Sequence, residues 1–389
     1  MKVSTPLRTF NFLYFALLAM FIPFLPVYFD DQGLNPAQIG VIIGTGGFIT
    51  IIAQPVWGMI SDRMRTIRKV LLILLVFSAV TGYLLYNTGS YPLLVAFAMV
   101  TYFFLMPIDP LTESLNFRIA ESSGINYGSI RTFGALGYAV MSLLTGVMMT
   151  HYGAHSLAIL FAVISVLGFI TMLFIPDAPV SSTPVKLGTL KEFIRNKETL
   201  WFLLLVFISS VPARMNDTFL GVYIRELGGS ATLVGVTWFL AAGSEIVVFA
   251  FSYWWLRQGK ELIMISVAGA FYFLRFFLSA FITDPQVLAY LQILQLLTFP
   301  VFYTAAIQYL YRIVPVEWRA TGQTLLALLF FGVSGIIASY IGGALYANLG
   351  GQTLFFIISA MSFLGMLLGL SLYFKYGRTR KSEKEMEQA

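Results

Sequence analysis

The stretch FLPVYFDDQGLNPAQIG at residues 24–40 recurs without a gap as FLGVYIRELGGSATLVG at residues 219–235. The two copies lie 195 residues apart in a chain of 389 and share Phe, Leu, Val, Tyr and two Gly in the same places. A second pair, GVMMTHYG at 146–153 and GALYANLG at 343–350, lies 197 residues apart. Shared helix-end chemistry could explain either pair alone. Two pairs at nearly one separation instead predict a chain built from two duplicated halves.

Apolar residues dominate both halves. Hydrophobic residues make up 58% of the chain and charged residues only 11%, whereas a soluble protein carries about 25% charged residues. Long, continuous apolar runs predict membrane-spanning helices rather than a barrel, because each can cross a bilayer of about 30 Å. Twelve such runs lie near 8–29, 37–60, 68–87, 92–117, 131–151, 156–175, 199–224, 232–256, 261–282, 286–311, 320–347 and 352–374. We therefore expect an all-α, multi-pass protein of the cell (plasma) membrane.

Basic residues fall on one side of these spans. The loop 63–69, the segment 186–197 and the tail 375–384 carry Lys and Arg on that side, whereas Asp30 and Asp31 lie in a loop on the other. The positive-inside rule then predicts that both termini are cytoplasmic. Topology explains the net charge of +6, so the charge does not indicate a nucleic-acid partner. The first apolar run lacks a small-residue cleavage site and is read as a retained span.

The segment 176–198 is rich in Pro, Ser and charge, and it is predicted to be a cytoplasmic linker. It would join an N-terminal six-helix bundle, residues 1–175, to a C-terminal six-helix bundle, residues 199–375, with a cytoplasmic tail at 376–389. Two parallel six-helix halves around a midplane site are typical of major facilitator transporters. We expect that fold, in a monomer.

The loop GMISDRMRTIRK at 58–69 matches the facilitator pattern of a Gly, an Asp four residues later and clustered basic residues. The residues of this latch motif are Gly58, Asp62, Arg63, Arg65 and Arg68. The pattern predicts ion pairs and helix-end contacts that hold the cytoplasmic face in one state. An ordinary basic loop is the alternative. The equivalent loop of the second half, WLRQGKEL at 255–262, no longer matches.

Ionisable residues also occur within the predicted spans, where each is costly. There are seven inside the spans or at their edges: Asp109, Glu113, Arg131, Arg214, Asp217, Glu245 and Arg275. Such residues usually mark substrate or ion pathways. The alternative is that they form interhelical ion pairs that contribute only specificity.

The segment PLTESLNFRIAESSGINYGSIRTFGALGY at 110–138 resembles the oligosaccharide–proton symporters, the family of the lactose permease. In that family a Pro precedes a Glu by three residues, an Arg follows the Glu by eighteen, and an aromatic residue follows the Arg by seven. Here these positions are Pro110, Glu113, Arg131 and Tyr138, with Tyr138 in place of the family's Trp. The resemblance implies that Glu113 and Arg131 bind sugar hydroxyls, while Tyr138 stacks on the pyranose face.

Two further residues join the predicted substrate site. Asn116 lies one turn after Glu113 on the same predicted helix. Asp109 lies one turn before Glu113 and has no acidic counterpart in the family. Asp109 could titrate or contact the substrate, or it could belong to a helix-breaking turn with its flanking prolines.

The resemblance continues into the second half, where Glu245, Arg275 and Asp217 match acidic and basic positions of the family. The family's proton-coupling His and Glu of span ten correspond here to Gln295 and Thr298, neither of which titrates usefully. A coupling carboxylate must therefore lie elsewhere.

We place proton coupling first on Glu245, modulated by Arg275, and second on Asp109. Asp217 is a weaker candidate because Arg214, one turn away, should hold it ionised.

These residues together predict a secondary active transporter that imports a sugar, glycoside or similar polar solute with protons by alternating access. One alternative is a multidrug or lipophile exporter, suggested by the 16% aromatic content. The fifth span, however, lacks the Gly-Pro pattern of facilitator drug antiporters. Another alternative is a nucleoside or aromatic-acid symporter.

Catalytic motifs are absent from the sequence. It contains no Cys, no metal-spaced cluster and no phosphate-binding loop, and His151 and His155 have no Ser or Cys partner pattern. We therefore expect no enzyme activity, no metal and no cofactor other than a proton or other ion gradient. The expected partners are a small-molecule solute, protons and membrane lipids.

Overall fold

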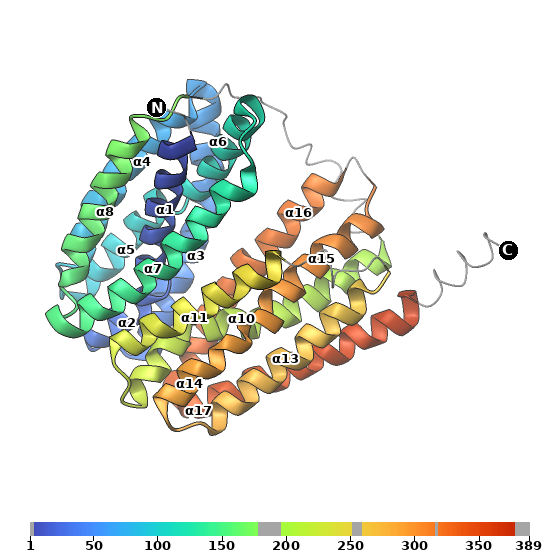
Figure 1. Ribbon diagram of the computed structural model, residues 1–389. Helices are drawn as coiled ribbons and strands as arrows, with labels where there is room; N and C mark the ends of the chain where they lie inside the picture. Colours follow the sequence, from blue (N-terminus) through green and yellow to red (C-terminus); the bar gives the residue numbers. More distant parts are fainter. Residues whose placement is uncertain (1–3, 178–195, 251–258, 316–317, 378–389) are drawn as a thin grey trace. The chain divides into compact units, whose positions relative to one another are not determined.

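The computed structural model describes residues 4–177, 196–250, 259–315 and 318–377 (Figure 1). Within these ranges the regular structure is helical and contains no strand. Most of the predicted linker 176–198, nearly all of the predicted tail 376–389 and the end of the predicted span 232–256 lie outside the described residues.

The helices follow one another with short connections. In chain order they are α1 (Ser4–Phe21), α2 (Phe24–Asp31), α3 (Pro36–Met64), α4 (Ile67–Leu85), α5 (Tyr91–Leu105), α6 (Ile108–Ser123), α7 (Tyr127–Tyr152), α8 (Ser156–Met172), α10 (Lys197–Glu226), α11 (Ala231–Ala250), α13 (Glu261–Phe281), α14 (Pro285–Leu291), the 3₁₀ helix η2 (Gln292–Leu297), α15 (Phe299–Ile313), α16 (Arg319–Ala327), the π-helix η4 (Leu328–Val333), α17 (Ser334–Leu372) and the π-helix η5 (Tyr373–Gly377).

These helices agree with the twelve predicted spans. Among the described residues, nine helical segments are long and apolar enough to cross a membrane. The shorter apolar helix α8, and α11 as far as Ile246, coincide with two more of the predicted spans. The segment Thr321–Tyr376 covers two predicted spans, which are divided where Gly350 leaves the helical conformation (φ 80°, ψ 165°). The predicted multi-pass helical fold is confirmed.

The repeated stretch of sequence folds in the same way in both halves. Gly33 and Gly228, which are equivalent in the two copies, have φ values of 80° and 85°. Each follows a helix end, where a glycine adopts the left-handed conformation without steric cost. Three backbone hydrogen bonds around Gly33 recur around Gly228 with the same separation of 195 residues. The second repeat agrees, because Gly153 and Gly350 have φ values of 77° and 80°.

The start of the next helix is repeated as well. The side chain of Asn35 caps α3 by accepting a hydrogen bond from the amide of Gln38 at 2.9 Å. At the equivalent positions, the Ser230 hydroxyl accepts from the amide of Leu233 at 3.2 Å. Asn and Ser are both good N-caps. The capping hydrogen bond is therefore present in both halves, although the capping residue is Asn in one and Ser in the other.

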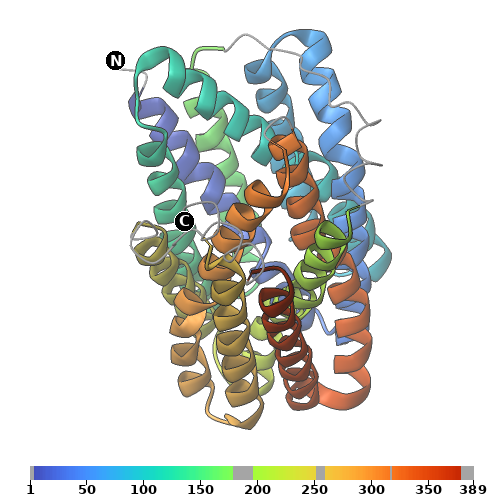
Figure 2. The ribbon, with the colours of Figure 1, turned by 90° about the vertical axis from the view of Figure 1, so that its right-hand side faces the viewer.

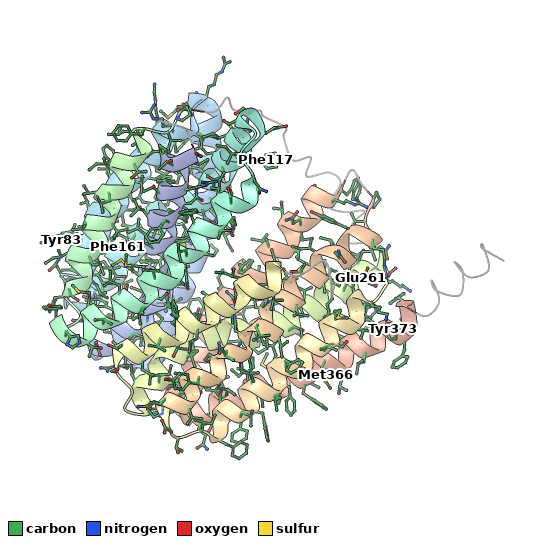
Figure 3. All side chains as sticks on the ribbon, viewed as in Figure 1. Tyr83, Phe117, Phe161, Glu261, Met366 and Tyr373 are labelled. Atoms are coloured by element: carbon green, nitrogen blue, oxygen red, sulfur yellow. The ribbon has the colours of Figure 1, made fainter. Side chains whose placement is uncertain are left out.

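By its internal contacts the chain forms two compact units. The first unit is Met1–Thr183 with Gly221–Gly243, and the second is Pro184–Leu220 with Ser244–Ala389. In the first unit α1 packs along α7 and α4 along α8, and Phe161 of α8 lies against Gly82 of α4 (Figure 3). In the second unit α13 packs along α17 (Figures 1 and 2). The division into six-helix bundles at 1–175 and 199–375 stays a prediction.

Glycines explain why residues 221–243 belong to the first unit. Gly146 of α7 and Gly235 of α11 face each other, and a Cβ on Gly235 would lie 2.6 Å from the Ser142 carbonyl oxygen. The Thr232 hydroxyl forms a hydrogen bond with that of Thr150 at 2.9 Å, next to this contact. Small residues let helix backbones approach closely, which is how helices associate in a membrane.

This packing predicts opposite effects at two glycines of α11. Gly235→Ala should lower the thermal midpoint of the detergent-solubilised protein, because the Ser142 backbone cannot move aside as a flexible side chain would, and overpacking costs about 1–3 kcal/mol. Gly243→Ala is the matched control, since nothing lies within 4 Å of its added Cβ, and it should leave the midpoint unchanged or higher. Equal midpoints for the two variants in a fluorescence melting assay would contradict the packing.

Candidate functional site

A break between two helices positions the acidic residues that the sequence singled out. Helix α5 ends at Leu105, and α6 begins after the turn Met106–Pro107. The predicted helix-breaking turn is therefore present, immediately before Asp109. Asp109 lies in the first turn of α6, where the helix dipole favours a negative charge. Among the described residues, its carboxylate forms no ion pair or hydrogen bond.

Glu113 and Arg131 meet, as their spacing predicts. The guanidinium of Arg131 on α7 forms an ion pair with the carboxylate of Glu113 on α6. The side chains are 49% and 25% exposed, so the pair is accessible to a solute. The Tyr127 hydroxyl donates a hydrogen bond to the second oxygen of the same carboxylate. Sequence reasoning missed Tyr127, although it lies only four residues before Arg131.

Glycines on α7 bring an aromatic ring to this pair. A Cβ on Gly134 would lie 2.7 Å from the Phe15 ring, and one on Gly137 would lie 2.8 Å from the Phe12 Cα. Since both positions are glycine, α1 packs close to α7 and the Arg131 guanidinium lies over the Phe15 ring, 4.8 Å from its centroid. The site thus combines a carboxylate, a guanidinium and an aromatic face.

The structure places Asn116 apart from this pair. It is 1% exposed, and its amide exchanges two hydrogen bonds, 2.7 and 2.8 Å long, with the buried Asn11 of α1. The amide that was predicted to bind substrate is thus engaged in interhelical packing. Tyr138 lies on α7 two turns after Arg131 and is partly buried. A stacking role for Tyr138 stays a prediction.

A second polar chain lies in the second unit. Arg275 of α13 is only 2% exposed. It donates hydrogen bonds to the side chains of Gln295 and Thr298, the latter at 3.1 Å. Gln295 in turn donates to the carboxylate of Glu245 at 2.9 Å. The predicted influence of Arg275 on Glu245 therefore passes through Gln295, which the sequence reasoning had set aside because it does not titrate.

Asp217 and Arg214 form the expected ion pair on α10. The Arg214 Nη2 lies 2.6 Å from an oxygen of Asp217, three residues further along the helix.

The latch motif lies where α3 ends and α4 begins. Arg65 ends α3 in the left-handed conformation, with φ 54°. Among the described residues the Asp62 carboxylate forms no ion pair. Instead Asp177, at the start of the predicted linker, caps α4 by accepting from the Thr66 hydroxyl and from the amide of Arg68 at 3.1 Å. Asp177 is a member of this cluster that the motif alone did not indicate.

The corresponding end of the second unit is also held by charged side chains. Glu261, at the start of α13 (Figure 3), forms an ion pair with Arg312 of α15 at 2.7 Å. Tyr309 donates to the buried carboxylate of Glu198 at 2.7 Å. The sequence motif has decayed in this half, yet an ionic contact still ties the helix ends together.

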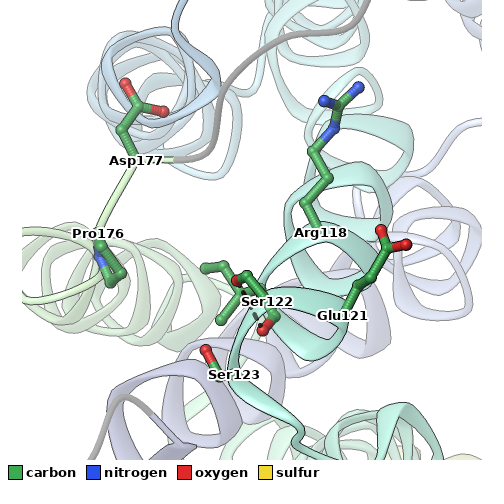
Figure 4. Close-up of a pocket in the computed structure, with 7 residues that line it drawn as sticks. Arg118, Glu121, Ser122, Ser123, Pro176 and Asp177 are labelled. Atoms are coloured by element: carbon green, nitrogen blue, oxygen red, sulfur yellow. Dashed lines mark hydrogen bonds between the residues drawn. The ribbon is translucent and has the colours of Figure 1, made fainter.

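A recess of about 390 Å³ opens at the end of α6 (Figure 4). Its lining residues are Arg118, Ile119, Glu121, Ser122, Ser123, Pro176 and Asp177. It begins more than one helical turn beyond Glu113 along α6, so it is separate from the Glu113–Arg131 pair. Among the described residues, no group of three or more His, Asp or Glu side chains could hold a metal ion.

Known proteins resemble this chain over almost its whole length. The uncharacterized transporter YwbF of Bacillus subtilis is 27% identical over 90% of this chain and 88% of its own. The maltose permease of Geobacillus stearothermophilus is 29% identical over 98% of this chain and 97% of its own. The crystal structure of the nucleoside transporter NupG has the same fold, with a TM-score of 0.86 at 16% identity over 97% of this chain and all of its own. A family model described as the MFS_1 like family matches residues 5–358. The chain belongs to this family, and so to the major facilitator transporters that its duplicated spans predict.

Proposed function

We propose that this protein is a secondary active transporter that carries a neutral hydroxylated solute, a sugar or a glycoside, together with protons. The Glu113–Arg131 pair supports this proposal most strongly, because it is solvent-accessible and lies in a membrane-spanning region. A carboxylate accepts hydrogen bonds from two sugar hydroxyls, a guanidinium donates several, and the Phe15 ring offers a face for C–H groups. The similarity to a maltose permease agrees with this chemistry.

Charge matching favours a neutral solute. Arg131, Arg214 and Arg275 are each matched by an acidic side chain, either directly or through Gln295. A solute with its own charge would have to displace one partner and leave the other uncompensated, which is costly in a membrane interior. A hydroxylated solute can add hydrogen bonds to both partners without separating them.

The loop between α3 and α4 fits a role in alternating access. We propose that the latch motif, together with Asp177, stabilises one of the two states at the end where charge bias predicts the cytoplasm. The cap that Asp177 provides to α4 supports this proposal, because it ties the start of the predicted linker to the latch loop.

A counterflow panel tests the proposed solute class. Purified protein in liposomes preloaded with unlabelled solute should exchange labelled maltose, whereas uridine, 3-phenylpropionate and a cationic dye should exchange at the rate of empty liposomes. Exchange of uridine or 3-phenylpropionate without maltose would favour the nucleoside or aromatic-acid alternative. Exchange of the dye alone would favour the exporter.

Proton coupling is better placed on Asp109 than on Glu245, the reverse of the order inferred from the sequence. Protonating Glu245 would leave the buried Arg275 without the negative charge that reaches it through Gln295. Protonating Asp109 breaks no contact among the described residues and leaves the Glu113–Arg131 pair intact. Asp109 can therefore gain and lose a proton at the smallest structural cost.

Two matched variants test this order. Asp109→Asn should abolish maltose accumulation driven by an inward proton gradient while sparing counterflow, because the neutral side chain imitates the protonated state permanently. Glu245→Gln should instead lower the thermal midpoint, since it leaves Arg275 uncompensated. If Asp109→Asn still accumulates maltose to the wild-type ratio, coupling does not use this carboxylate.

A further inference from the structure

The first residue of α7, Tyr127, binds the same carboxylate as Arg131. Tyr127 and Arg131 are four residues apart, so their side chains leave α7 on one face. The Tyr127 hydroxyl donates a hydrogen bond to Oε2 of Glu113, and the Arg131 Nη1 donates to Oε1. Each oxygen of the Glu113 carboxylate therefore has a partner within the first unit.

Arg131 keeps unused donors, whereas Glu113 does not keep an unused oxygen. An Arg–carboxylate pair is frequently bidentate, with two parallel N–H···O hydrogen bonds. Here the Tyr127 hydroxyl takes the oxygen that the second of these bonds would use. Among the described residues, the Nε and Nη2 of Arg131 donate no hydrogen bond. A solute oxygen can therefore bind Arg131 directly, but a solute hydroxyl that approaches Oε2 of Glu113 meets the Tyr127 hydroxyl there.

The Tyr127 hydroxyl offers Glu113 the same chemistry as a sugar hydroxyl. Each is a neutral O–H group that donates one hydrogen bond to an ionised oxygen. When one replaces the other, the number of hydrogen bonds to the carboxylate stays constant, and the cost of an unsatisfied charged group is avoided. A solute without such a hydroxyl cannot make this exchange.

Tyr127 can leave Glu113 without disturbing α7. As the first helical residue, its amide is one of the four N–H groups that have no acceptor within the helix. The side chain of the N-cap residue, Asn126, forms no capping hydrogen bond. Tyr127 is 38% exposed, and its ring packs edge-on against Phe117, which is 61% exposed, with ring centroids 6.3 Å apart. Neither ring is enclosed, so Tyr127 can turn away from Glu113 at little cost in packing.

We propose that Tyr127 is an internal competitor of the solute, whose hydroxyl occupies Glu113 until a solute hydroxyl displaces it. The inference rests on the proposed function, and it adds a specificity-determining residue to the Glu113–Arg131 pair. When only a fraction of the protein is competent to bind, the apparent affinity falls by that fraction. Tyr127 therefore lowers the affinity for the solute, and it favours solutes that bring a hydroxyl to replace its own.

The variant Tyr127→Phe tests this competition, because it removes the hydroxyl and keeps the ring. The half-saturating concentration of maltose, measured by counterflow with purified protein in liposomes, should fall about three- to tenfold relative to wild type. A second measurement does not depend on transport. Maltose at one fixed concentration should raise the thermal midpoint of the detergent-solubilised variant more than that of wild type, because tighter binding stabilises the folded state more.

Tyr311→Phe is the matched control for this variant. The Tyr311 hydroxyl donates to the side chain of Gln323 in the second unit, so its loss should change neither measurement. A half-saturating concentration in Tyr127→Phe equal to or above that of wild type would overturn the inference and leave the proposed function standing, because the hydroxyl would then be idle or would itself bind the solute. Absence of maltose exchange and binding by the wild type would overturn both.

Discussion

The cost of a charge in hydrocarbon is the constraint on which this structure depends. A charged side chain within a membrane span is tolerated when it finds a partner or an aqueous cavity. In this protein the partners come mostly from different helices, so satisfying the charges also fixes which helices lie next to each other. The contacts are Glu113–Arg131 between α6 and α7, Arg214–Asp217 within α10, and Arg275–Gln295–Glu245 between α13, η2 and α11.

Small residues make these contacts geometrically possible. The approach of α1 to α7 at Gly134 and Gly137 places the Phe15 ring under Arg131. The break before α6 serves the same end, because it starts a new helix whose first turns carry Asp109 and Glu113. Helix association in a membrane relies on close packing, since lipid tails are as apolar as the side chains they replace. The polar site is therefore a consequence of backbone packing as much as of residue choice.

The sequence predicted what depends on local chemistry. Apolar runs located the spans. The repeat at 24–40 and 219–235 predicted two equivalent turns between helices, and these turns share a glycine conformation and an N-cap. The spacing of Glu113 and Arg131 in the sequence also predicted that these two side chains meet. Contacts between distant helices were not predictable, because periodicity shows which face a residue occupies and not what lies opposite. The pairing of Asn116 with Asn11 and the bridging role of Gln295 are of this kind.

A double-mutant cycle on the first ion pair tests the central claim, that the pair exists to bind solute rather than to hold helices together. Glu113→Gln, Arg131→Gln and the double variant are compared for thermal midpoint and for maltose binding by the detergent-solubilised protein. Because both side chains are partly exposed, the pair should contribute only about 0–1 kcal/mol to stability. We predict midpoints close to wild type and loss of maltose binding in all three variants. Low midpoints in the single variants, with both stability and binding restored in the double variant, would show that the pair is structural.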